Sequence, residues 1–133
     1  MDRQWKINVA GFVANIQAAV KHLPEGGRIV SEGLGLGTRA GLPGTADYAA
    51  TQAPVIGYSK GSARDLGLRN VTVNVVQAGL MATDMAAASK DGLPTGLMDI
   101  HAIRRIATFE EVAAGILFLA GPSRGTSPIQ YWM

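Results

Sequence analysis

Residues 71–76 (Val-Thr-Val-Asn-Val-Val) constrain the fold of this 133-residue chain more than any other stretch. The run is rich in β-branched residues and almost continuously apolar, which is typical of a strand buried on both faces. A shorter strand is expected at 28–31, and a helix that begins near Thr45 or Asp47 and ends at Gly67 connects the two. A helical crossover between two buried strands predicts a parallel pair with a right-handed connection.

Further helices are expected before and after this unit. Apolar residues recur every three or four positions from 5 to 23, which indicates an amphipathic helix. The sequence Thr-Phe-Glu-Glu at 108–111 is a capping box, and it predicts a last helix that ends at Gly121. Residues 77–105 are expected to form a long loop with helical pieces near 81–89 and 97–105. Because two parallel strands leave sheet edges unpaired and faces uncovered, the chain is interpreted as part of a larger α/β fold.

Composition and charge argue against several classes of protein. The 12 Lys and Arg against 10 Asp and Glu give a net charge of +2, too small to indicate a nucleic-acid partner. No apolar run approaches ~18 residues, and residues 1–6 lack the apolar core of a signal peptide, so neither a membrane span nor secretion is expected. The absence of cysteine excludes disulfides and thiolate catalysis and favours a cytoplasmic location. No metal site is expected.

One glycine-rich segment has the form of a dinucleotide fingerprint. Residues 35–40 (Gly-Leu-Gly-Thr-Arg-Ala) follow a strand and match Gly-x-Gly-x-x-Ala. A working fingerprint needs a helix that begins inside the motif and an acidic residue after the next strand. Residues 42–44 (Leu-Pro-Gly) interrupt such a helix, and no acidic residue closes the strand at 71–76. A strand-exit loop is therefore favoured over a phosphate loop.

Several short motifs share their order and spacing along residues 2–122. They are Asn8-Val-x-Gly11, Leu23-Pro-Glu-Gly-Gly-Arg-Ile-Val30, Pro43-Gly-Thr-Ala-Asp-Tyr48, Gly57-Tyr-Ser-Lys-Gly-x-Ala-Arg-Asp-Leu-Gly67, Gly79-x-x-x-Thr83-Asp-Met and Glu110-Glu-Val-Ala-x-x-x-x-Phe-Leu-Ala-Gly121. Together they resemble the short-chain dehydrogenase/reductase family, in its 3-oxoacyl-carrier-protein-reductase-like branch. The resemblance implies hydride transfer between NAD or NADP and a carbonyl or hydroxyl carbon. It also implies a doubly wound Rossmann-type parallel sheet, of which this chain holds the C-terminal, catalytic-side part: about two strands with flanking helices.

The resemblance also suggests how the chain is divided. Residues 1–122 are interpreted as a partial domain that lacks the family's N-terminal nucleotide-binding half. Residues 123–133 are interpreted as a divergent tail, because the family places its last strand and a Val-Asp-Gly-Gly sequence there.

The family's catalytic set is Asn, Ser, Tyr and Lys, and only half of it is present. Asn8 and Tyr48 match the asparagine that anchors a water relay and the tyrosine that acts as general acid/base. Leu34 occupies the serine position, and Gln52 occupies the lysine position four residues after the tyrosine. A neutral glutamine cannot lower the pKa of a neighbouring phenol as a cation does, and leucine cannot donate to a developing oxyanion.

No nearby residue is expected to replace the missing groups. Lys60 lies 12 residues beyond Tyr48, about 18 Å along the helix axis. Ser31 is three residues before Leu34, so along a strand it points to the opposite face.

Cofactor-binding positions follow from the same resemblance. Gly79 and Thr83 match the segment that contacts the nicotinamide, although Ala78 replaces the usual proline before it. With Tyr48 and Gln52 they form the expected NAD or NADP site, and binding by this chain is expected to be weakened.

The helix at 45–67 carries two further features. Pro54 is expected to disturb it, because a mid-helix proline removes a hydrogen bond and clashes with the preceding turn at a cost of ~3 kcal/mol. Small residues recur along it every four positions, at Ala49, Ala53, Gly57 and Gly61. Such a stripe permits close helix approach. The resemblance implies a homo-oligomer interface formed by helices 5–23 and 45–67, whereas spacing alone is equally compatible with packing on the chain's own sheet.

Three hypotheses on function follow. The first is a truncated oxidoreductase with an incomplete catalytic set that is inactive alone. The second is a non-catalytic module that uses the small-residue stripe to dimerise with itself or with intact relatives. The third is a half-enzyme completed by a separate nucleotide-binding chain.

Overall fold

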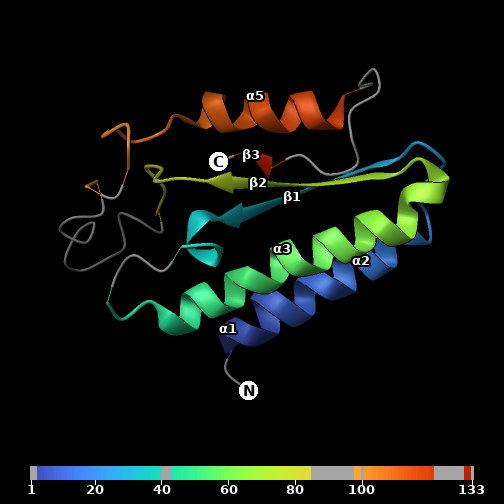
Figure 1. Ribbon diagram of the computed structural model, residues 1–133, viewed down its shortest axis with the longest axis horizontal. Coiled ribbons are helices and arrows are strands. Elements are labelled where there is room, and N and C mark those ends of the chain that lie inside the picture. Colours follow the sequence, from blue (N-terminus) through green and yellow to red (C-terminus); the bar gives the residue numbers. More distant parts are fainter. Residues whose placement is uncertain (1–2, 40–42, 85–97, 100, 122–130, 133) are drawn as a thin grey trace.

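The computed structural model describes residues 3–39, 43–84, 98–99, 101–121 and 131–132. In chain order its elements are α1 (Arg3–Trp5), the π-helical segment η1 (Lys6–Gly11), α2 (Phe12–Val20), β1 (Arg28–Leu34), the 3-10 turn η2 (Gly35–Gly37), α3 (Ala46–Leu66), the 3-10 turn η3 (Gly67–Arg69), β2 (Thr72–Ala78), α5 (Phe109–Ala120) and β3 (Tyr131–Trp132). The helices α2 and α3 cover one face of the sheet, and α5 covers the other (Figure 1).

The sheet confirms the predicted parallel pair. β1 and β2 run parallel in register from Arg28 opposite Thr72 to Leu34 opposite Ala78, with α3 as the crossover. The core lies where the end of α3 meets the start of β2, and partly buried residues of α2 and β1 pack against it. Its buried members are Ala63, Leu66, Val71 and Val73. Burial of these apolar side chains holds the crossover helix on the sheet.

One arginine fastens the two turns at the amino end of the strands. The Arg69 guanidinium donates to the backbone carbonyl oxygens of Val20, at 3.1 Å, and Leu23, just after α2. In return, the backbone N–H of Gly26 donates to the Arg69 carbonyl oxygen at 2.9 Å. A cation at the C-terminal end of a helix satisfies free carbonyls and opposes the helix dipole.

The predicted helices at 5–23 and 45–67 are present with shifted ends. The first spans α1, η1 and α2 and ends at Val20. The second is α3, which begins after Thr45, a residue whose side chain makes no capping bond. It runs through Pro54 without interruption, so the proline is accommodated inside a continuous helix.

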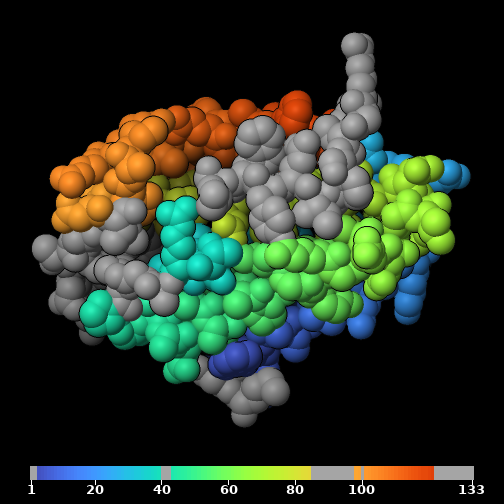
Figure 2. Space-filling model, viewed as in Figure 1, coloured from blue at the N-terminus to red at the C-terminus, as the bar shows by residue number. Residues whose placement is uncertain are grey.

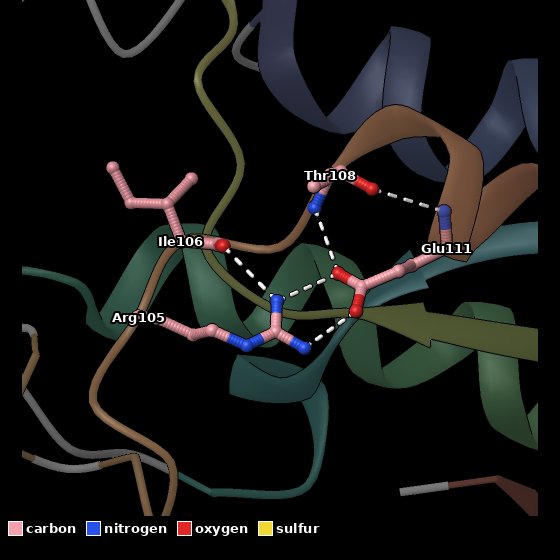
Figure 3. Close-up of polar contacts among 4 residues, drawn as sticks. All are labelled: Arg105, Ile106, Thr108 and Glu111. Atoms are coloured by element: carbon pink, nitrogen blue, oxygen red, sulfur yellow. Dashed lines mark hydrogen bonds and ion pairs between the residues drawn. The ribbon is translucent and has the colours of Figure 1, made fainter.

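The capping box before α5 is confirmed, and an arginine reinforces it (Figure 3). The Glu111 backbone N–H donates to Thr108 Oγ1 at 3.3 Å, and the Thr108 backbone N–H donates to Glu111 Oε2 at 2.9 Å. Arg105 forms a bidentate ion pair with the Glu111 carboxylate, in which Nη1 of Arg105 lies 2.7 Å from Oε2 of Glu111. The hydrogen bonds from Arg105 and the Thr108 backbone lower the pKa of Glu111 to about 2.

Other expectations need correction or lie outside the described residues. A third strand, β3, pairs in parallel with β2 at 131–132, inside the segment interpreted as a divergent tail. The expected helical piece at 97–105 is wrong, because the described residues there, 98–99 and 101–105, form turns and bends. Of the piece at 81–89, residues 85–89 lie outside the described part. No described helix has the length and apolar character that a membrane crossing needs.

Candidate active site

The residues that match the family's catalytic set gather where β1 ends and α3 begins. Leu34 is the last residue of β1, and Tyr48 and Gln52 lie one turn apart on the first half of α3. Asn8 approaches α3 from the π-helical segment η1. α/β proteins bind their ligands at the carboxyl ends of the parallel strands. The sheet topology therefore places these positions at the expected end of the sheet.

Asn8 is bound to α3 through a buried threonine. The Asn8 side-chain amide donates to Thr51 Oγ1 at 3.1 Å, and the Thr51 hydroxyl donates to the backbone carbonyl oxygen of Tyr48 at 2.8 Å. Thr51 is completely buried. The prediction from sequence missed Thr51, although a threonine three residues after Tyr48 is well placed to bond back to that carbonyl.

Leu34 and Gln52, the two positions that depart from the family's set, are bonded to each other. The Leu34 backbone N–H donates to the side-chain oxygen Oε1 of Gln52 at 3.2 Å. Both residues are half-buried. The glutamine side chain therefore faces the end of β1.

Tyr48 stands at this site without a polar partner among the described residues. Its side chain is half-buried, and within the described ranges nothing bonds to its hydroxyl. Lys60 lies on the exposed surface three turns further along α3, as expected from its spacing. The cation that the family places beside the tyrosine therefore has no counterpart on this helix face.

The expected nicotinamide-contacting segment leaves the neighbouring strand end. Gly79 directly follows β2, whose last residue, Ala78, is in register with Leu34. The side chain of His101 lies over Gly79: a Cβ added there would be 3.5 Å from His101 Nε2. The Thr83 backbone N–H donates to the carbonyl oxygen of Met81 at 3.0 Å. Gly79 thus lies at the same end of the sheet as Leu34, the carboxyl end of the strands.

The glycine-rich segment after β1 is a strand-exit loop, as favoured from sequence. Residues 35–37 form a 3-10 turn, and Thr38 caps it by donating to the Gly35 carbonyl oxygen at 2.9 Å. No α-helix begins within the described part of the motif, 35–39. It therefore lacks the helix N-terminus on which a dinucleotide fingerprint depends.

The small-residue stripe on α3 faces away from the chain's own core. Ala53, Gly57 and Gly61 are exposed, and a Cβ added at either glycine would meet nothing within 4 Å. An open groove of about 430 Å³ runs beside them, between α3 and Val13 of α2. The stripe is therefore not used for packing on this chain's own sheet at these glycines.

Comparison with known proteins places the chain in a family. Residues 1–127 match the family described as Enoyl-(Acyl carrier protein) reductase. A cyclic-di-GMP-binding biofilm dispersal mediator protein of Escherichia coli (strain K12) is 42% identical over 123 residues, 92% of this chain and 51% of that protein. A 3-oxoacyl-(acyl-carrier-protein) reductase of Salmonella typhimurium is 40% identical over 94 residues, 71% of this chain and 38% of that protein. The chain belongs to the short-chain dehydrogenase/reductase family.

Solved structures agree with this assignment. A short-chain dehydrogenase from Burkholderia cenocepacia J2315, solved in complex with NADP, is 40% identical with a TM-score of 0.76. The match covers 86% of this chain and 46% of that one. The predicted family and its Rossmann-type sheet are confirmed, and NAD(P) is supported as the family's cofactor. The chain spans about half the length of these relatives, or less.

The residues at positions 34 and 52 do not fit the family's way of binding the substrate oxygen and the cofactor. Gln52 carries no charge, and its side-chain oxygen is already engaged by the Leu34 N–H. A leucine side chain offers no hydrogen bond to a substrate oxygen. The fold is that of the family, whereas these two side chains differ from its catalytic set.

Proposed function

We propose that this chain is the catalytic-side portion of a short-chain oxidoreductase and does not catalyse hydride transfer on its own. The observation that carries the proposal is the hydrogen bond between Leu34 and Gln52, which engages the residue at the lysine position with the protein's own backbone. Tyr48 then has no cation beside it to favour loss of its proton. By the family resemblance, Tyr48 and Asn8 occupy positions of the reaction site, and Gly79 and Thr83 occupy positions that contact the cofactor in the family.

The size of the defect follows from general catalytic energetics. Loss of one donor to a developing oxyanion costs ~3–4 kcal/mol, a factor of roughly 10²–10³ in rate. Loss of the cation beside the tyrosine removes a separate contribution to the same proton transfer. Because such groups act on one transition state, restoring either of them alone is expected to recover little.

Cofactor binding by the chain itself gives the first test. We expect isothermal titration of the purified chain with NADPH to show no measurable binding. A dissociation constant below about 100 μM, ~5.5 kcal/mol, would contradict the proposal.

Restoration of the site gives the second test. The chain is joined to the N-terminal half of a 3-oxoacyl reductase of the family, with a family-type last strand, and every version carries Pro54→Ala. The initial rate of NADPH oxidation with a 3-oxoacyl substrate is compared for this chimera, Leu34→Ser, Gln52→Lys and the double variant. We expect substantial turnover only in the double variant. Turnover near that of the parent reductase in the unreverted chimera would show that Leu34 and Gln52 are tolerated.

A second function, dimerisation, is favoured by the exposed stripe on α3. We propose that two copies of this chain associate through helices 5–23 and 45–67, with Gly57 and Gly61 at the closest approach. The support is the open space over both glycines and the groove beside them, which leave room for a neighbouring helix. A dimer of this kind requires no turnover.

The remaining alternative is a half-enzyme completed by a separate nucleotide-binding chain. It is tested by mixing the purified chain with a separately produced N-terminal half and measuring NADPH oxidation. Activity in the mixture, with none in either half measured separately, would favour this alternative over an inactive chain. The cytoplasmic location expected from the cysteine-free sequence stays a prediction.

A further inference from the structure

Two separate contacts join the loop after β1 to α3 at a single residue. The side chain of Gln52 accepts the N–H of Leu34 at 3.2 Å, and the backbone of Gln52 lies directly against Gly37. A Cβ added at Gly37 would be 2.9 Å from the Gln52 carbonyl carbon and 3.0 Å from its oxygen. In Figure 2 the loop lies against the surface of α3. The part of the loop that leaves β1 therefore contacts α3 at two points, Leu34 and Gly37.

The Leu34 amide needs a partner that the sheet does not provide. β1 is the edge strand of the described sheet, since it pairs only with β2. An edge strand directs part of its backbone N–H groups away from the ladder. Leu34 is half-buried, and its N–H meets a side-chain acceptor from a neighbouring element. Gln52 supplies it from α3.

The chemistry of the acceptor distinguishes glutamine from the residue that the family has at this position. A glutamine amide has a carbonyl oxygen that accepts, whereas a lysine ammonium has three donors and no acceptor. A lysine at position 52 therefore cannot make the contact seen here. At Gly37 a side chain would collide with the α3 backbone, so this close approach of the loop to the helix requires glycine.

We propose that Gln52 is a positioning residue that latches the β1 exit loop to α3, and that the Leu34 amide is its partner in place of a cofactor. The latch requires an acceptor at position 52 and is indifferent to the side chain at position 34. The latch concerns only the conformation of the loop. The proposal can therefore be tested separately from whether the chain binds NADPH or turns over substrate.

Amide hydrogen exchange at Leu34, followed by NMR, tests the latch. In the unaltered chain the Leu34 amide is expected to exchange at least tenfold more slowly than a free amide. Gln52→Met, which keeps the length but removes the acceptor, and Gln52→Lys should lose about tenfold of this protection, or ~1.4 kcal/mol. Gln52→Glu keeps the acceptor and should retain the protection. The control is Gln17→Met, at an exposed position of α2, which should leave it unchanged.

Three results would overturn the proposal. The first is an unprotected Leu34 amide in the unaltered chain, which needs no variant and so does not depend on any of them folding. The second is equal protection in Gln52→Met and the unaltered chain, with the amides of β2 still protected as a check on the fold. The third is a Gln52→Glu variant that behaves like Gln52→Met, since the acceptor would then not be the property that matters.

Discussion

Gly57 and Gly61 allow the proposed dimer to be separated from the stability of the single chain. The perturbation is the double variant Gly57→Gln and Gly61→Gln. Both glycines lie inside α3 and are exposed, with open space where a Cβ would be. In a single copy the two long polar side chains extend into solvent. In a close helix–helix contact they occupy the space that the partner helix needs.

The two effects have opposite signs. Glycine inside a helix is about 1 kcal/mol worse than alanine, and glutamine is close to alanine, so the two replacements together should stabilise the single chain by up to about 2 kcal/mol. For a chain of this length, a gain of that size raises the melting temperature by up to about 8 °C. Overpacking at a contact costs ~1–3 kcal/mol per site, so the dimer dissociation constant should rise at least tenfold.

The assays are sedimentation equilibrium for association and thermal unfolding, at a concentration where the chain is monomeric, for stability. Ala113→Gln, at an exposed position of α5 on the other face of the sheet, is the control and should leave association unchanged. An unchanged dissociation constant in the double variant would show that the stripe is not the contact. A lower monomer melting temperature would show that the space over the glycines is not open.

Three further outcomes are expected from the fold. Pro54→Ala should raise the free energy of unfolding by up to ~3 kcal/mol and increase the helical circular dichroism, because it restores a backbone donor inside α3. Arg69→Met should lower the free energy of unfolding in urea by about 2 kcal/mol, because it leaves the carbonyls after α2 without their charged donor, whereas the exposed Arg3→Met should stay within about 0.5 kcal/mol. The pKa of Glu111 is about 2 in the folded chain, below the ordinary 4.5, so its contribution is complete above pH 4.5 and is lost as the pH falls toward 2. Glu111→Gln should remove this part of the acid dependence in a circular-dichroism titration.

Local patterns predicted the elements of this fold because the forces behind them are local. The apolar run at 71–76 and the capping box at 108–111 depend on neighbours within a few residues, and both are confirmed. β3 could not be predicted in this way. Its two residues have no periodicity of their own, and they form a strand because β2 offers them a free edge.

The contacts of the candidate site join residues far apart in the sequence. Asn8 and Thr51 are 43 residues apart, and Leu34 and Gln52 are 18 apart. The sequence identified three of these four positions through the family resemblance. The sequence could not show that these residues form hydrogen bonds with one another, because those bonds depend on how α3 packs against the sheet and against η1.

These contacts give the two substitutions different consequences for any attempt to restore activity. The latch uses the backbone N–H of Leu34, so Leu34→Ser leaves it intact while it replaces the half-buried isobutyl group with a hydroxymethyl group. Gln52→Lys restores the cation but removes the acceptor of the Leu34 N–H. We therefore expect the same substitution to release the loop from α3. The single lysine reversion is therefore expected to show both low turnover and lost protection of the Leu34 amide, whereas the single serine reversion shows low turnover with the protection retained. A lysine variant that keeps the amide protected would mean that the loop is held by other contacts, with the close approach of Gly37 to α3 as the first to examine.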